Sequence, residues 1–130
     1  MRGRKLTVLI DSWAWIEYFR GSEAGKKARE YIEGGEELLV STVNLAEIYR
    51  WFLKYYDEAS AEKARGIIKR RCVIIDVDEE IAVKAAKIRH EMGWGLGDSI
   101  IYATARRENA KVLTGDEDFK GVEGVIYIGK

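Results

Sequence analysis

Three consecutive carboxylates, Asp116 to Asp118, stand in the segment TGDEDF directly after the apolar run AKVL. Three remote acids occupy comparable positions: Asp11 ends the apolar run LTVLI, Glu47 follows ELLVST at a short distance, and Asp98 precedes IIYATA. Carboxylates brought together repel one another unless they protonate or bind a cation. An all-oxygen ligand set without His or Cys favours Mg²⁺ or Mn²⁺ over Zn²⁺. Such ions polarise a phosphate and promote ionisation of water, so these residue types suit phosphodiester hydrolysis.

Each acid also has an explanation that needs no metal. Asp98 has the residue type and position of a helix N-cap. Glu47 fits a solvent-exposed stripe with the basic residues that follow it on the same helix face. Asp116 and Asp118 fit a turn, where aspartate is common. Asp11 is the hardest to explain in this way, because an unpaired charge at the end of a buried strand is costly.

The elements that must position these acids alternate between strand and helix. Apolar, β-branched runs without alternation predict buried strands, and apolar residues at helical spacing predict the helices between them. Continuous apolar strands separated by helices predict one α/β domain spanning residues 1–130, with a mostly parallel sheet of four to five strands covered on both faces. The expected strands cover 5–11, 37–42, 72–76, 110–115 and 124–129, and the expected helices cover 12–20, 23–34, 43–56, 58–71, 79–93 and 98–109.

This fold would bring the remote acids to one place. Right-handed crossovers set the carboxyl ends of all the parallel strands along one edge of the sheet. Ligand sites in open α/β sheets form at that edge, near the point where the strand order switches. We therefore expect Asp11, Glu47, Asp98 and Asp116 to converge there.

Composition limits the other classes of function. Lys plus Arg equals Asp plus Glu, 22 of each, so contact with a nucleic acid must rest on local basic patches. The single Cys72 excludes an internal disulfide and is typical of a reducing cytosol, so we expect a cytoplasmic protein. The apolar run LTVLI is too short for a signal peptide or a membrane span. Depletion of Gln, Asn, Cys and His beside abundant Glu, Lys and Arg favours a thermophilic source.

Four segments, LIDSWAWIEYF, STVNLAEIY, GLGDSIIYATARREN and VLTGDEDF, resemble the PIN-domain family in their order and spacing. They are most similar to VapC-type toxins, the ribonucleases of toxin–antitoxin pairs. The resemblance extends from Leu9 to Phe119 and implies a three-layer α/β/α sandwich. It carries the acidic quartet of the family to Asp11, Glu47, Asp98 and Asp116. It further implies an endoribonuclease in which Mg²⁺ or Mn²⁺ activates water, leaving 5′-phosphate and 3′-hydroxyl ends.

The resemblance also suggests supporting roles around the quartet. Ser12 and Thr114 match small hydroxyl positions of the family and are expected to hold the ligands by hydrogen bonds. Asp118 matches a less constant acid and is expected to act as a ligand through a bridging water. Trp94, in the loop GWGLG, either stacks on a base of single-stranded RNA or anchors the loop on apolar surface.

Partners are suggested by the aromatic residues of the early helices. These residues fill the core or form an interface, and a domain of this size cannot bury all of them. In the family, the early helices form a groove for the C-terminal helix of a VapB-type antitoxin, and the toxins form homodimers, so both partners are expected here. The aromatic residues are Trp13, Trp15, Trp51, Tyr55 and Tyr56.

Three other functions compete with the toxin ribonuclease. A haloacid-dehalogenase-like phosphatase would use Asp11 as nucleophile, but it needs an acid where Trp13 stands, and it leaves Glu47 and Asp98 unused. If Glu47 and Asp98 lie close to the Asp11 carboxylate, the ribonuclease is favoured over the phosphatase. A nuclease of RNA maturation or decay would share the quartet, although the short chain without a zinc ribbon favours the toxin. A non-catalytic RNA-binding or assembly module is the third alternative.

Overall fold

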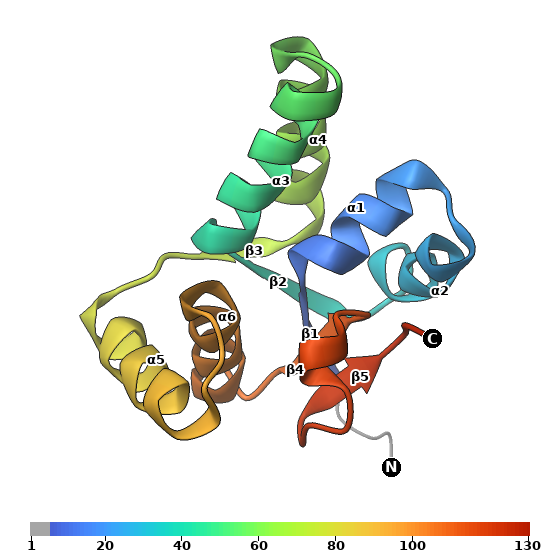
Figure 1. Cartoon of the computed structure of the whole chain (residues 1–130). Coiled ribbons are helices and arrows are strands. Elements are labelled where there is room, and N and C mark those ends of the chain that lie inside the picture. Colours follow the sequence, from blue (N-terminus) through green and yellow to red (C-terminus); the bar gives the residue numbers. More distant parts are fainter. Residues whose placement is uncertain (1–5) are drawn as a thin grey trace.

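A five-stranded parallel sheet forms the centre of the computed structural model, which describes residues 6–130 (Figure 1). Its spatial order is β3-β2-β1-β4-β5, and every neighbouring pair runs parallel. The predicted first strand included Lys5, which lies outside the described residues. The strands are β1 (Thr7–Ile10), β2 (Glu37–Ser41), β3 (Val73–Ile75), β4 (Lys111–Thr114) and β5 (Val125–Tyr127).

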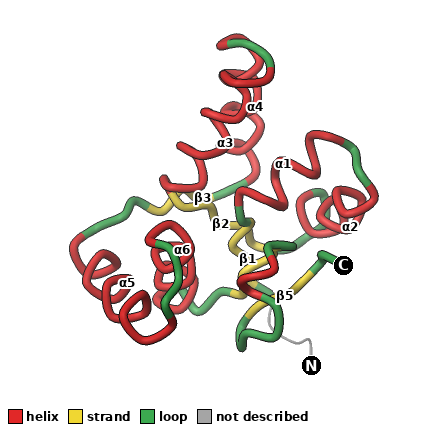
Figure 2. Tube along the Cα trace, in the orientation of Figure 1, coloured by secondary structure: helices red, strands yellow, loops and turns green. Residues whose placement is uncertain are grey.

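Six helices cover the two faces of this sheet, as the alternation of strand and helix predicted (Figure 2). Val8, Ile10 and Val40 point to one face and pack against the first four helices. Leu9 and Leu39 point to the other face and pack against α6. The three-layer α/β/α prediction is therefore confirmed. The helices are α1 (Ser12–Arg20), α2 (Glu23–Ile32), α3 (Thr42–Tyr55), α4 (Glu58–Arg71), α5 (Glu79–Met92) and α6 (Leu96–Arg107).

Local signals at several helix ends agree with the sequence, although α2 ends at Ile32 instead of Gly34 and α6 at Arg107 instead of Asn109, and the largest difference at a helix start is in α6. The side chains of Asp57 and Asp78 accept hydrogen bonds from the first turns of α4 and α5, and Gly93 ends α5 in a left-handed conformation. This last helix was expected from Asp98 but begins at Leu96 with Gly95 as its N-cap. Glycine in GWGLG predicts a loop, and the prediction is wrong here because Gly97 is helical.

The strand order switches at β1, and this position determines where a site can form. The chain moves outward from β1 through β2 to β3, then crosses to the other side of β1 with β4 and β5. Ile10 at the end of β1 is paired with Leu113 near the end of β4, so the loops that follow both strands start side by side. None of the described helices combines the length and apolar character needed to cross a membrane.

Candidate metal centre

Asp11 lies directly after β1 at this switch point, and only 4% of its surface is exposed. Its backbone N–H donates to the carbonyl oxygen of Leu113 at 3.0 Å, which extends the pairing of β1 with β4. The hydroxyl of Thr114 donates to Asp11 Oδ2 at 2.7 Å, and Asn44 Nδ2 donates to Asp11 Oδ1 at 3.2 Å. Backbone and side-chain contacts together fix the carboxylate at the edge of the sheet.

Glu47 reaches the same edge from α3. Its Oε1 accepts a 2.5 Å hydrogen bond from the hydroxyl of Ser12, the residue after Asp11. Its Oε2 lies beside the first turn of α6, since a Cβ built on Gly97 would be only 3.5 Å from it. Gly97 directly precedes Asp98, so Glu47 lies between the end of β1 and the start of α6.

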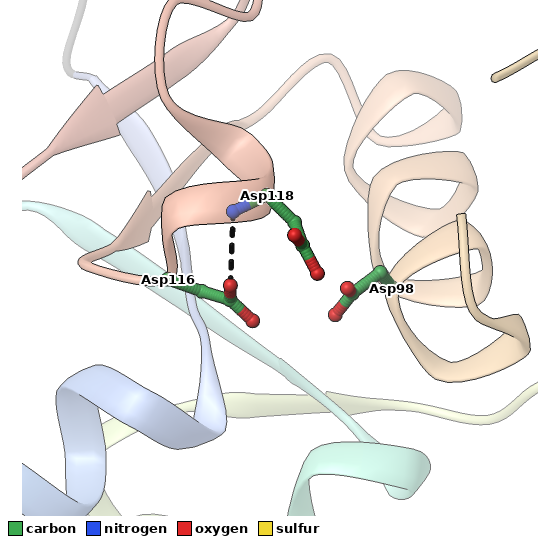
Figure 3. A group of neighbouring side chains, drawn as sticks. All are labelled: Asp98, Asp116 and Asp118. Atoms are coloured by element: carbon green, nitrogen blue, oxygen red, sulfur yellow. Dashed lines mark hydrogen bonds between the residues drawn. The ribbon is translucent and has the colours of Figure 1, made fainter. Parts of the chain in front are cut away.

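Asp98, Asp116 and Asp118 form the tightest group of acids (Figure 3). Each offers a carboxylate oxygen, and these oxygens all lie within 4.8 Å of one another. Asp98 comes from the first turn of α6, whereas the other two come from the loop after β4. Asp116 Oδ1 accepts the backbone N–H of Asp118 at 3.0 Å, and the Thr114 hydroxyl oxygen accepts the N–H of Asp116 at 3.0 Å. The loop thus holds its two aspartates in place through its own backbone.

Burial and mutual repulsion raise the pKa values of two acids in this cluster. Burial is the main cause that raises the pKa of Asp11 from 3.8 to about 6, opposed by the hydrogen bond from Thr114 and assisted by the charges of Glu47 and Asp116. Burial also raises the pKa of Asp98 to about 7, and the charges of Asp116, Asp11, Asp118 and Glu47 add to this effect. Without a cation, the folded chain therefore resists full ionisation of the cluster.

A hard divalent cation fits this set of residues. The candidate metal ligands are all carboxylate oxygens, which is the ligand type that Mg²⁺ and Mn²⁺ prefer. Burial and the neighbouring carboxylates raise the pKa values of Asp11 and Asp98, and a divalent ion would offset the charge of the ionised group. The site also stays accessible, since Asp98 and Asp116 are half-buried while Glu47 and Asp118 are exposed.

The structure decides between several of the alternatives for single acids. Asp98 does not act as an N-cap, because α6 begins two residues before it and Gly95 occupies the cap. Glu47 accepts from Ser12, and within residues 6–130 no ion pair joins it to Arg50 or Lys54. Asp116 serves the turn with Oδ1, as the turn explanation predicted, and one oxygen of its carboxylate belongs to the group with Asp98.

The mutual influence of the acids also bears on the phosphatase alternative. The charge of Glu47 contributes to the raised pKa of Asp11, and the charge of Asp11 contributes to that of Asp98. The phosphatase would leave both Glu47 and Asp98 unused. Glu47 contacts Ser12, the residue after Asp11, and lies beside the turn that carries Asp98, which favours the four-acid site over the phosphatase.

Trp94 packs in the way that its anchoring explanation predicted. Its ring meets the rings of Tyr102 and Phe119 edge-on, with centroids 5.3 and 5.1 Å apart. Phe119 is fully buried, so Trp94 ties the loop before α6 to the loop that carries Asp116. A direct contact of Trp94 with RNA remains a prediction.

Asn44 is the residue of this site that the sequence argument missed. It is fully buried and touches both Asp11 and Ser12. A signal was present, because Asn44 lies three residues before Glu47 and therefore on the same side of α3. It was overlooked because asparagine near the start of a helix is ordinarily explained by capping alone.

Comparison with known proteins agrees with the geometry. Residues 8–125 match the family model of the PIN domain. A toxin–antitoxin complex from Klebsiella pneumoniae contains a chain of the same fold, with a TM-score of 0.79 and 27% sequence identity over 95% of this chain and 98% of that one. Among curated protein sequences, none matches significantly.

Two further solved structures share the fold at lower identity. VapBC2 from Rickettsia felis, bound to a fragment of promoter DNA, gives a TM-score of 0.73 at 19% identity, covering 94% of this chain and 97% of that chain. VapC20 from Mycobacterium tuberculosis, described as a toxin that cleaves the sarcin–ricin loop, gives a TM-score of 0.74 at 18% identity, covering 91% of this chain and 96% of that chain. By its family match and its fold, the chain belongs to the PIN domain family.

Proposed function

We propose that this PIN domain is a metal-dependent endoribonuclease and the toxin of a type II toxin–antitoxin pair. The observation that carries the proposal is that acids from four separate parts of the chain lie near the switch point of the sheet. Asp98, Asp116 and Asp118 place oxygens within 4.8 Å of one another, and Asp11 and Glu47 act on the same cluster through their charges. Such crowding favours a bound cation and serves no evident purpose in stabilising the fold.

Mg²⁺ or Mn²⁺ would be held by Asp11, Glu47, Asp98 and Asp116, with Asp118 acting through water or directly. When bound, the ion polarises a phosphodiester group and promotes ionisation of water. The chain itself contributes the positions of the ligands: β1 fixes Asp11, α6 presents Asp98, and the loop after β4 presents Asp116. Because these elements meet at a packed sheet, the ligands are held before any substrate arrives.

An RNA strand is a suitable substrate for the open, partly exposed cluster. A polymer can reach a site at the surface, whereas a small phosphorylated metabolite is normally enclosed in a pocket. The chain carries no net charge, so RNA binding would depend on the metal and on local contacts. RNA specificity in such a site would come from the shape of the surface and from single-stranded context.

The activity is tested with purified protein and total RNA. We expect cleavage in Mn²⁺, loss of cleavage in EDTA, and loss of cleavage in Asp98→Asn with the fold retained by circular dichroism. Sequencing of RNA ends would identify the cut site and should find 5′-phosphate ends. Failure of the folded wild-type protein to bind Mn²⁺ and to cleave any RNA would instead support a non-catalytic module. Cleavage confined to one precursor RNA would favour a role in maturation.

A VapB-type antitoxin is the proposed protein partner. The support is the resemblance to VapC-type toxins and the toxin–antitoxin complexes among the structures of similar fold. A groove of about 320 Å³ between α1 and the α3–α4 pair has a mainly apolar lining that includes Phe19, Trp51, Phe52 and Tyr56, beside the charged Arg20 and Lys63, and Tyr56 is 63% exposed. An apolar groove beside two helices suits the apolar face of an amphipathic helix.

A small open reading frame beside the gene, encoding a DNA-binding protein with an amphipathic C-terminal helix, would supply this partner. Co-expression should give a stable complex and suppress RNA cleavage. A genomic neighbourhood without such a frame, together with a protein that does not slow growth when expressed alone, would contradict the toxin role. The homodimer expected from the resemblance belongs to the same proposal.

A further inference from the structure

Asn44 is at the centre of a chain of hydrogen bonds that connects two of the acids, and its orientation is fixed from outside the site. Its Oδ1 accepts the backbone N–H of Ser41 at 3.1 Å. A backbone N–H can only donate, so the oxygen of the Asn44 amide must face Ser41 and its NH₂ group must face the acids. The assignment of the two amide atoms therefore follows from the chemistry of the partner.

The two donors of the Asn44 amide meet different acceptors. One goes to Asp11 Oδ1 at 3.2 Å, and the other goes to the hydroxyl oxygen of Ser12 at 2.9 Å. Because the Ser12 oxygen accepts from Asn44, its own proton is free to point elsewhere, and it points to Glu47 Oε1 at 2.5 Å. The direction of every bond is thus set from Ser41 outward to Asp11 and Glu47.

These hydrogen bonds restrict Glu47 most, because its side chain is exposed and has several rotatable bonds. A free glutamate side chain would populate many rotamers, and fixing one of them costs conformational entropy. The bond from Ser12 holds Oε1, and it leaves Oε2 beside Gly97 at the start of α6, next to Asp98. Asn44 donates to the Ser12 oxygen and so fixes the hydroxyl group in the orientation from which its proton reaches Glu47.

We propose that Asn44 is a positioning residue of the metal site: it holds Asp11 directly, and it orients Glu47 through the Ser12 hydroxyl. The proposal rests on the proposed metal-dependent function. Asn44 also completes a capping box with Ser41 at the start of α3, so a purely structural role is the alternative. The two roles predict different effects on metal affinity.

The affinity of the purified protein for Mn²⁺ distinguishes the positioning role of Asn44 from the purely structural one. It is measured by titration calorimetry and by the electron paramagnetic resonance signal of the free ion. Asn44→Leu keeps about the same volume and removes all three hydrogen bonds. We expect it to weaken Mn²⁺ binding by about 10- to 100-fold, the range typical of residues that support metal ligands. Raising the Mn²⁺ concentration should restore much of the RNA cleavage, because the variant keeps its metal ligands and is defective only in how tightly they bind the ion. Asn44→Ala is the second variant, and circular dichroism shows which of the two is folded.

Ser41→Ala is the matched control, because it removes the other half of the capping box and leaves the donors of Asn44 in place. It should lower the urea midpoint of unfolding while its Mn²⁺ affinity stays within about twofold of the wild type. Equal Mn²⁺ affinity in wild type and Asn44 variants would overturn the inference. An equal loss in the Ser41 control would also overturn it, in favour of the structural role. Absence of Mn²⁺ binding in the wild type would overturn the metal site itself, and the inference with it.

Discussion

Removing the Asp11 charge should stabilise the metal-free fold, even though it destroys the proposed site. The pKa of Asp11 is raised from 3.8 to about 6, mainly by burial. Such a difference between the unfolded and folded states corresponds to about 3 kcal/mol at pH values above both. Asp11→Asn removes this penalty and keeps an oxygen for Asn44, while its amide can donate to Thr114, whose hydroxyl is free to rotate. We therefore expect a gain of about 1–3 kcal/mol in the free energy of unfolding at pH 8.

The sign of the pH dependence follows from the raised pKa. Because the folded protein binds the Asp11 proton more tightly than the unfolded chain, this carboxyl favours folding below pH 3.8 and loses that contribution as the pH rises through about 6. The amide that replaces the carboxyl in the Asp11→Asn variant does not titrate. The advantage of the variant should therefore be complete above pH 7, about half developed at pH 5, and small at pH 4.

The assay is urea denaturation in EDTA at pH 4, 5 and 8, followed by circular dichroism. Glu117→Gln is the matched control, because it removes a charge from the same edge of the sheet at an exposed position and should change stability by less than about 0.5 kcal/mol. An Asp11→Asn variant that is less stable than the wild type at pH 8 would contradict the proposed charge penalty at Asp11. A gain that is the same at pH 4 and pH 8 would also contradict it.

Four other perturbations have expected outcomes. Asp116→Asn should reduce RNA cleavage at least about 100-fold while the protein stays folded, as measured by turnover of a fluorescent RNA beside circular dichroism. Thr114→Val leaves a buried Asp11 oxygen and the N–H of Asp116 without their partner, so it should lower the free energy of unfolding by about 1–3 kcal/mol in urea denaturation. Mn²⁺ at about 100 times its dissociation constant should stabilise the wild type by about 2.7 kcal/mol, visible as a higher Tm, and should have less effect on Asp116→Asn. Sedimentation at high micromolar concentration should show self-association through the early-helix aromatics, weakened by Trp51→Ala, whereas a wholly monomeric wild type would contradict this expectation.

Much of the fold could be predicted because two signals in the sequence agree. Apolar runs such as LTVLI and KVL mark strands buried on both faces, and charged segments at helical spacing mark the covering helices. Their alternation leaves a parallel sheet with right-handed crossovers as the simplest solution. The carboxyl edge of that sheet then locates Asp11 and Asp116 without any knowledge of side-chain contacts.

Details that depend on atomic contacts could not be predicted in the same way. The helix α6 starts two residues before the predicted position, because glycine, which signals a loop in the sequence, is also tolerated in a first helical turn. The role of Asn44 depends on its distances to Asp11 and Ser12, which lie more than thirty residues away in sequence. The close group that Asp118 forms with Asp98 depends on how the loop after β4 turns toward α6. Local spacing carries no information on such contacts.

Crystals of the protein soaked in Mn²⁺, with the ion located by its anomalous scattering, give the sharpest test of the metal site. We predict a peak within ligand distance of the carboxylates of Asp98 and Asp116, at the switch point between β1 and β4. The peak should be lost in Asp98→Asn crystals of the same form. A wild-type map with no peak at this cluster, from protein that cleaves RNA in Mn²⁺, would contradict the central claim.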